Sequence, residues 1–342
     1  MRKKFDEIFE DCTKLGTKIR TDEYHPNGKH PIIDQGQEMV AGFTDLEDGL
    51  FDAVPAIVFG DHTRIIKYVD YPFFLGADGV KVLRSKVPDA NYRYLYYALE
   101  NARIPNTGYN RHYKWLKELE IEYPPISQQI KTVKVLDEVE SIIHNRQNQL
   151  QKLDELVKAR FVELFGDPVT NPMDWPTKPL LEMGYCKNGM NFHTGDSGIE
   201  MHCLGVGDFK DYSVIDGTDY LPTISLNEAP PEESMLQDGD LVFVRSNGNK
   251  ALVGRCLLVY PHNKPTTYSG FCIRYRLTSA EVNIAYLLRV LKTDSMRKKM
   301  AGHGANIQNL NQQILAALNI PTPPLELQEW FTAFIEQIDK SK

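Results

Sequence analysis

The chain has 342 residues, of which 42% are hydrophobic and 25% are charged, and its formal net charge is −7. This length exceeds what a single hydrophobic core usually serves, so we expect two or three compact units. An acidic balance argues against simple nonspecific nucleic-acid binding, which a basic excess usually carries. Any nucleic-acid surface therefore has to be a local concentration of Lys and Arg.

The sequence lacks the features of a membrane, secreted or zinc-cluster protein. No run approaches the roughly 18 apolar residues of a membrane helix, and the first residues contain no apolar signal core. We therefore expect a soluble, cytoplasmic protein. The cysteines are odd in number and without a close pair, so we interpret them as reduced core thiols rather than disulfide or zinc ligands; they are Cys12, Cys186, Cys203, Cys256 and Cys272.

The first part of the chain is predicted to be rich in strands. Short apolar runs bounded by Gly, Asp or Pro predict strands over 31–34, 55–59, 65–69 and 80–83. Helical spacing of apolar residues predicts a helix over 91–102 and a short one around Trp115 and Leu119. We assign residues 1–123 to one strand-rich module.

Residues 124–165 are predicted to form one long helix. Its apolar residues fall seven apart, which is typical of a coiled-coil stripe and of a partner-binding surface; they are Leu136, Ile143, Leu150, Val157 and Leu164. Pro124 and Pro125 begin the helix, and Gly166 followed by Pro168 ends it. At ~1.5 Å per residue this helix is roughly 60 Å long, so we interpret it as a spacer.

The second half of the chain repeats the first. Leu116, Ile121, Pro124-Pro125 and Gln129 recur 199 positions later as Leu315, Ile320, Pro323-Pro324 and Gln328. The match continues upstream with smaller offsets, pairing Tyr94-Leu95 with Tyr286-Leu287 and Ile57-Val58-Phe59 with Leu241-Val242-Phe243. We therefore expect a second module over 166–322 and a second helix over 323–342.

The two helices differ in length. The second has 18 residues from Leu325 to Lys342 and is marginal alone, so we expect it to pack against the first helix in an antiparallel coiled coil. Such a pairing would relate the modules by a pseudo-twofold axis and leave much of the spacer stripe uncovered. An exposed seam of that size predicts a protein partner.

The motifs of common enzyme classes are absent from the sequence. There is no P-loop, no Asn/Asp-Pro-Pro-aromatic turn of a methyltransferase, and no pair of His residues with the spacing of a zinc hydrolase. We expect no enzymatic activity, no cofactor and no metal site.

Several polar segments could read DNA. The strongest candidate is the run from Arg245 to Arg255, because Asn can pair with adenine and Arg with guanine; its candidate residues are Arg245, Asn247, Asn249, Lys250 and Arg255. A hairpin turn with Asn-Gly at its tip explains the same residues equally well. In the first module the candidates are Lys18, Arg20, His25, Arg64, Lys67, Arg111, His112 and Lys114, and the place of Arg111 to Lys114 is matched by 306–311 in the second.

This pattern resembles the DNA-specificity subunit of type I restriction-modification systems. The resemblance covers the whole chain and is carried by the helix exit Glu163-Leu164-Phe165-Gly166-Asp167-Pro168, by the Pro-Pro helix starts ending at Gln129 and Gln328, and by the run from Val242 to Gly248. It implies an α+β fold with two target-recognition domains, separated by conserved helices, that read the two halves of a split DNA site.

The resemblance also implies partners. DNA adenine methyltransferase subunits, which bind S-adenosylmethionine, would dock on the helices, and a motor-nuclease restriction subunit would add translocation and cleavage. The short second helix departs from the family, so homo- or hetero-association through it is an open possibility. The competing hypothesis is a coiled-coil adaptor whose two modules bind proteins and not DNA.

Overall fold

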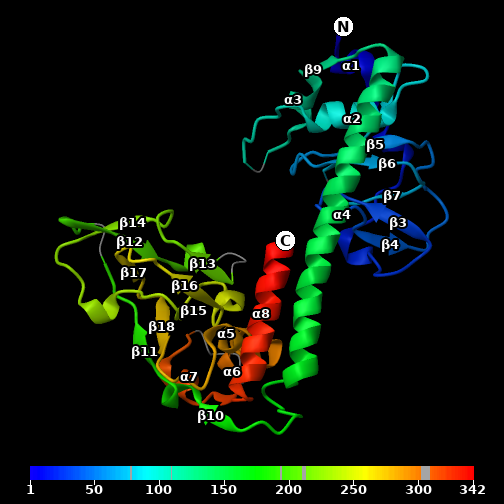
Figure 1. Cartoon of the computed structure of the whole chain (residues 1–342). Coiled ribbons are helices and arrows are strands. Elements are labelled where there is room, and N and C mark those ends of the chain that lie inside the picture. The colour runs from blue at the N-terminus through cyan, green and yellow to red at the C-terminus, as the bar shows by residue number, and fades with distance from the viewer. Residues whose placement is uncertain (78, 109, 193–194, 210–212, 302–308) are drawn as a thin grey trace. The chain divides into compact units, whose positions relative to one another are not determined.

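The computed structural model describes residues 1–77, 79–108, 110–192, 195–209, 213–301 and 309–342 (Figure 1). They form two compact units, Met1–Gln147 and Asn148–Lys342, each with sheets and a core of its own. The long helix α4 (Ile126–Phe165) contributes to both. The predicted fold class, α+β with two strand-rich halves and long helices, is confirmed.

The described residues of the first unit form three sheets. One is antiparallel with the order β2-β8-β5-β6, one has the order β4-β3-β7 with β3 and β7 parallel, and β1 pairs with β9. The strands are β1 (Arg2–Lys4), β2 (Phe9–Asp11), β3 (His30–Ile33), β4 (Gly42–Thr44), β5 (Ala56–Gly60), β6 (Ile66–Val69), β7 (Phe74–Leu75), β8 (Val80–Ser85) and β9 (Glu120–Glu122). The helices are α1 (Phe5–Ile8), α2 (Tyr92–Glu100) and α3 (Tyr113–Lys117).

Strand β5 separates the two main cores of the first unit. Ile57 and Phe59 face the core that contains the apolar side of α2, whereas Ala56 and Val58 face the core shared with β3 and β7. This alternation follows from the two-residue period of a strand, and the absence of polar side chains shows that both faces are covered. The four strands and the two helices predicted for this part of the chain are all present, with ends shifted by a few residues.

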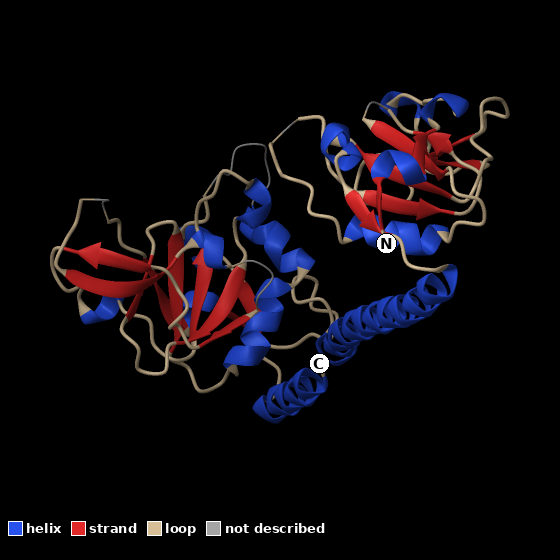
Figure 2. Ribbon diagram, turned by 90° about the horizontal axis from the view of Figure 1, so that it is seen from above, coloured by secondary structure: helices blue, strands red, loops and turns tan. Residues whose placement is uncertain are grey.

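The second unit follows the same plan with longer strands. Its largest sheet has the order β11-β18-β15-β16-β13, a second has the order β14-β12-β17, and β10 pairs with β19. The strands are β10 (Thr177–Pro179), β11 (Gly184–Asn188), β12 (Ile199–Leu204), β13 (Val214–Asp216), β14 (Thr223–Leu226), β15 (Asp240–Val244), β16 (Cys256–Tyr260), β17 (Thr266–Tyr268), β18 (Cys272–Leu277) and β19 (Asn319–Pro321). The helices are α5 (Ile284–Lys292), α6 (Asp294–Ala301), α7 (Gln312–Ala316) and α8 (Leu325–Ser341), and they gather on one side of the large sheet (Figure 2).

The internal repeat is visible in the strand registers. Phe59 of β5 lies opposite Ile66 of β6, and the corresponding Phe243 of β15 lies opposite Cys256 of β16. The two-stranded sheets of the two units also share a register, because Lys3 lies opposite Ile121 in the pair β1–β9 and Lys178 lies opposite Ile320 in the pair β10–β19. Helices α2, α3 and α4 therefore correspond to α5, α7 and α8.

Helix α4 begins and ends where the sequence predicts. It starts directly after Pro124 and Pro125 and continues for 40 residues. It ends at Gly166, whose φ of +72° is a conformation that glycine adopts without strain and whose N–H donates to the carbonyl of Val162 at 2.9 Å. A side chain at this position would also collide with Pro172.

Helix α8 packs antiparallel on the last part of α4, as predicted. Near the start of α8, the ring of Phe331 lies 5.7 Å from Phe161 and 5.4 Å from Phe165, close to the end of α4. At the other end, Lys342 Nζ lies 2.7 Å from Asp154 Oδ1. Aromatic packing therefore supplies the apolar contact that an isolated helix of this length needs.

The spacer stripe is covered only in part. Val157 is buried and Leu164 packs against the core of the second unit, while Leu136 and Leu150 are half-buried and Ile143 is 52% exposed. Ile130, Val135 and Ile142 are also exposed. The prediction of a partner surface is therefore corrected at Val157 and Leu164, because this chain's own helices already cover them.

Among the described residues, no helix is both long and apolar enough to cross a bilayer.

Candidate nucleic-acid interface

The segment after β15 forms an exposed loop on a rigid base. Strand β15 is buried along its whole length and ends at Val244. The next residue is anchored on both sides, because Arg245 N–H donates to Phe271 O at 2.8 Å and Arg245 O accepts from Leu310 N–H at 2.8 Å. Ser246 forms a further bridge to Asn309. A loop held in this way presents its side chains in a defined direction.

The loop connects the antiparallel strands β15 and β16, so it is a hairpin connection, but a long one that its asparagine side chains shape. Asn247 Oδ1 accepts from Asn249 N–H at 2.8 Å, and Asn249 Oδ1 caps the short turn Lys250–Leu252 through Ala251 N–H at 3.0 Å. A Cβ added at Gly248 would meet no atom within 4 Å, so this backbone faces open space. The side-chain oxygens of both asparagines shape the loop, and their amide nitrogens are the groups suited to contact a base edge.

The two arginines of this segment are both half-buried but lie at different places in the loop. The guanidinium of Arg245 donates from Nη1 to Gly270 O at 3.3 Å, so it lies beside the tip that joins β17 to β18. Arg255 is half-buried directly before β16, while Lys250 and Asn249 are exposed. Arg245, Asn247, Asn249 and Lys250 thus share one loop, and Arg255 lies at its base.

The sequence-based search missed Phe271. Its backbone carbonyl binds both Arg245 and Ser246 N–H groups, and its side chain is 60% exposed although the residues that follow it in β18 are buried. The sequence feature that could have indicated it is an aromatic residue placed directly after Gly270 and directly before a buried strand. An exposed ring beside polar base-reading groups can stack on a base or wedge into a base step.

In the first unit, the corresponding segments also meet. Asp61, which corresponds to Arg245, accepts at its carbonyl from His112 N–H at 2.7 Å, and Arg64 Nη1 reaches Ile104 O at 3.3 Å. The loop after β5 therefore lies beside the segment before α3, just as the loop after β15 lies beside the segment before α7. Of the segment 306–311 that matches Arg111 to Lys114, residues 306–308 lie outside the described residues.

Two candidates in the first unit are corrected to structural roles. The Lys67 side chain is 4% exposed, and its Nζ donates to the carbonyls of Asp34 at 2.9 Å and Glu38 at 2.6 Å. Burial lowers the pKa of this ammonium group, and the nearby carboxylate of Asp34, which favours the charged form, offsets only part of this shift. His112 is fully buried with Nδ1 3.0 Å from Asp61 O. Neither side chain can reach DNA, because each is enclosed by other segments of the first unit.

The remaining candidates of the first unit are on the surface but on separate elements. Arg111 and Lys114 flank buried His112, and Lys114 Nζ lies 4.9 Å from the ring of Trp115. Lys18 and His25 form bridges to Leu75 and Phe43, beside the sheet β4-β3-β7, and the nearby Arg20 pairs with Asp22 at 3.1 Å.

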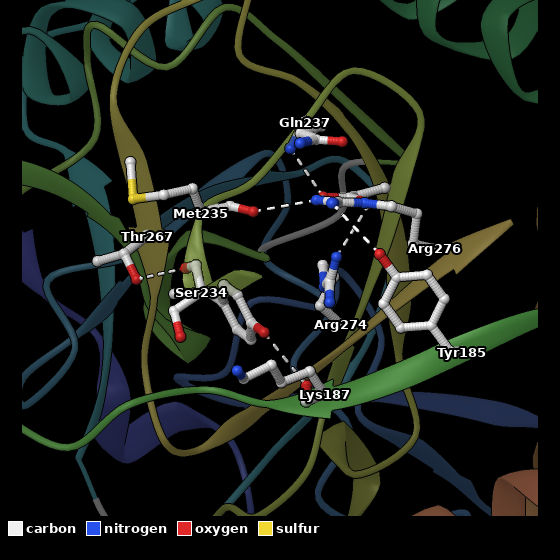
Figure 3. A network of polar contacts seen from close by, with 10 residues as sticks. Tyr185, Lys187, Ser234, Met235, Gln237, Thr267, Arg274 and Arg276 are labelled. Atoms are coloured by element: carbon white, nitrogen blue, oxygen red, sulfur yellow. Dashed lines mark hydrogen bonds and ion pairs between the residues drawn. The ribbon is translucent and has the colours of Figure 1, made fainter. Parts of the chain in front are cut away.

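A buried polar network stiffens the strands that carry the second loop (Figure 3). Asp240, at the start of β15, receives two hydrogen bonds of 2.7 Å from Arg276 of β18, and this ion pair raises the pKa of Arg276. Arg274 is fully buried under the ring of Tyr185, and its Nη1 lies 3.9 Å from Asp240 Oδ1. One carboxylate of β15 thus pairs with two arginines of β18, the buried Arg274 and the half-buried Arg276.

Comparisons with known proteins agree on one family. The sequence model of the Type I restriction modification DNA specificity domain matches residues 1–154 and 221–342. The StySPI specificity subunit of Salmonella potsdam is 28% identical over 157 residues, which cover 44% of this chain and 33% of that protein. The MjaVIII specificity subunit of Methanocaldococcus jannaschii is 22% identical over 299 residues, which cover 78% of this chain and 69% of that protein. The alignment thus spans only about a third of the StySPI subunit.

Solved structures share the fold. The crystal structure of a type I restriction-modification S subunit from M. genitalium matches all of this chain and 89% of its own length, with a TM-score of 0.58 at 16% identity. A structure from a study of type I complex assembly and conformational transition matches with a TM-score of 0.54 at 15% identity. At these identities the likeness concerns the architecture alone.

Proposed function

The chain belongs to the family of type I restriction modification DNA specificity proteins, and from that premise we propose that it reads a bipartite DNA sequence, one half with each unit. The observation that carries this proposal is the repeat of one arrangement. In each unit a loop after a buried central strand lies beside the segment before a short helix, and both segments carry base-capable side chains. As a specificity subunit, the chain selects the sequence and leaves catalysis to other polypeptides.

The reading groups follow from the chemistry of the residues on these loops. Arg245, Asn247 and Asn249 would read base edges in one half-site, with Phe271 beside them. In the first unit, Arg64 and Arg111 take the corresponding place, and Lys114 supplies a phosphate contact. Lys18, Arg20 and His25 add exposed positive or polar groups on the neighbouring sheet. The acidic net charge is compatible with this proposal because these groups are concentrated on loops.

The spacer helix supports a split site with a set interval. An uninterrupted helix of 40 residues is roughly 60 Å long, and DNA repeats every ~34–36 Å. The exposed apolar residues of α4, such as Ile130, Val135 and Ile142, are suited to bind DNA adenine methyltransferase subunits. A motor-nuclease subunit would complete the restriction complex. Because its substrate would be cellular DNA, the protein would act in the cytoplasm.

The test is selection of duplexes from a random library by the full chain, followed by binding measurements at several salt concentrations. We expect two short conserved blocks at one spacing, and an affinity that falls roughly a thousandfold between 50 and 200 mM salt. With its methyltransferase, the protein should direct methylation of adenines in that sequence. Absence of any salt-dependent duplex binding would reject the proposal in favour of a protein-binding adaptor.

A further inference from the structure

Arg93 forms ion pairs that connect helix α2 of the first unit to α4. Arg93 of α2 approaches Asp137 Oδ1 with Nη2 at 2.6 Å and Nε at 3.1 Å, and its Nη2 also lies 2.9 Å from Glu140 Oε2. Asp137 and Glu140 are three residues apart, so they project from the same face of the helix. A planar guanidinium that binds both carboxylates restricts rotation of α4 about its own axis, which a single point contact would not do.

Three tyrosines hold this guanidinium in place. The carbon of the Arg93 guanidinium lies 5.0 Å from the ring of Tyr68, 5.4 Å from Tyr96 and 5.1 Å from Tyr97. The hydroxyl of Tyr97 accepts from Arg93 Nη2 at 2.9 Å and donates to Asp137 Oδ1 at 2.6 Å. Partial burial alone would raise the pKa of Asp137. The hydrogen bonds from Tyr97 and Arg93 outweigh this effect and lower the pKa, so the carboxylate stays charged at neutral pH.

The second unit has no such joint at the corresponding positions. Because Tyr94 corresponds to Tyr286, Arg93 corresponds to Ala285 and Tyr96 to Leu288. Because β6 and β16 share a register, Tyr68 corresponds to Leu258. Its helices are held instead by rings, with Phe165 4.8 Å from Tyr286 and 5.4 Å from Phe331. The first unit thus joins its helices through an arginine that binds two carboxylates, whereas the second combines ring packing with other polar contacts, such as those of Lys342 with Asp154 and of Asn283 with Gln328.

We propose that Arg93 is a positioning residue that locks the first recognition unit onto the spacer helix and thereby sets the distance between half-sites that the protein accepts. This inference rests on the proposed function. The base-reading loops are not part of the joint, so its loss should leave each half-site readable. What should change is the tolerance for spacing, because α4 could then take several orientations on the first unit.

The experiment compares binding of the full chain to duplexes whose half-sites are separated by the selected spacing or by one and two base pairs more or fewer. For Arg93→Leu we expect affinities for each isolated half-site within about twofold of wild type, whereas the preference for the correct spacing falls roughly fivefold or more. For Arg93→Lys we expect a spacing preference between those of wild type and Arg93→Leu, because an ammonium group cannot bind two carboxylates in the planar arrangement of a guanidinium. The pair Arg93→Glu with Asp137→Arg should restore part of the preference.

Arg103→Leu is the matched control, because Arg103 is exposed just beyond the end of α2 and contributes nothing to the joint. A spacing preference that stays sharp in Arg93→Leu would overturn the inference. Should Arg93→Leu fail to fold, as judged by circular dichroism, Asp137→Asn replaces it with the same expectation, since this change removes the charge and keeps the side-chain size.

A second measurement separates this inference from the proposed function. Spin labels at the exposed positions Leu46 and Gln147, both in the first unit, report the orientation of α4 on that unit without DNA. The distance distribution should be narrow in wild type and broaden in Arg93→Leu, with Cys12 and Cys186 replaced by serine beforehand. An unchanged distribution would reject the joint even where DNA binding is intact. A broadened one would support it even where no bipartite sequence is found.

Discussion

The two helix starts of the repeat share a sequence but differ in how their buried polar groups are paired. Gln328 is fully buried, and its Oε1 accepts from Asn283 N–H at 2.8 Å while its Nε2 donates to Pro323 O at 2.7 Å and Glu281 O at 3.1 Å. Gln129 is 1% exposed and donates to Pro124 O at 2.8 Å, but its Oε1 has no partner among the described atoms. A duplicated motif therefore keeps its side chain while its hydrogen bonding diverges.

The same contrast holds for buried charge. In the second unit Asp240 serves Arg276 and Arg274 in the core, whereas in the first unit the buried Lys67 is held mainly by backbone carbonyls. Backbone carbonyls remain whatever side chain a residue carries, whereas a carboxylate partner can be removed by one substitution. The second unit should therefore be the more vulnerable of the two to a single mutation.

The largest effect is expected at Asp240. Asp240→Asn leaves the buried Arg274 and the half-buried Arg276 without a negative partner, and we expect the free energy of unfolding of the second unit to fall by about 3–5 kcal/mol. Urea denaturation followed by tryptophan fluorescence measures this change. Asp219→Asn, which breaks an exposed pair with Lys264, is the control and should have a far smaller effect on the unfolding free energy. Equal losses in the two variants would contradict the role given to burial.

The paired glutamines allow a direct test of the divergence. Gln328→Leu leaves the Asn283 N–H and two carbonyls without their partner, so we expect a loss of about 2–3 kcal/mol in unfolding free energy. Gln129→Leu removes one bond and relieves an unpaired oxygen, so a loss of about 1 kcal/mol or less is expected. Thermal unfolding of both variants under identical conditions decides the matter. A larger loss at Gln129 would show that its oxygen does have a partner in solution.

The recognition loops should be separable between the units. Arg245→Ala is expected to weaken discrimination at one base position by about 1–3 kcal/mol and only within one half-site. Arg64→Ala should act in the same manner on the other half-site. Duplex selection with each variant reports which block of the sequence has changed. Changes in both blocks from one substitution would disprove the assignment of one unit to each half-site.

The smallest effect on stability is expected at the exposed stripe of α4. Ile143→Ser changes an exposed side chain and should alter the unfolding free energy by less than about 0.5 kcal/mol. Val157→Ala, on the same helix but 3% exposed, should cost about 1–3 kcal/mol through lost packing. Co-purification with the methyltransferase should be weakened by Ile143→Ser alone. Normal complex formation by this variant would exclude Ile143 from the partner surface.

Much of the architecture could be predicted because its signals are local. Pro124-Pro125 and Gly166 mark the ends of α4 through backbone constraints that hold in any fold, and the short apolar run that contains Ile57-Val58-Phe59, bounded by Pro55 and Gly60, predicts a strand. The repeat was readable for the same reason, since Gln129 and Gln328 follow the same pair of prolines at the same distance.

The candidate site was predicted less completely because exposure is decided by distant parts of the chain. Lys67 and Arg64 are three residues apart, yet only Lys67 is enclosed, by carbonyls of Asp34 and Glu38 that the fold brings to it. Phe271 directly precedes the buried strand β18, and nothing local in the sequence shows that its ring is left in solvent after Gly270.

The sequence by itself determined a duplicated α+β chain with a long helix between its halves and base-capable residues on matching loops. These features depend on periodicity, on proline and glycine, and on repetition, all of which act over short distances. Only the tertiary structure decided which of those residues face solvent, which part of the α4 stripe is already covered by α8, and that Arg93 joins α2 to two acids more than forty positions away. Those outcomes depend on contacts between remote segments, whose geometry no local pattern encodes.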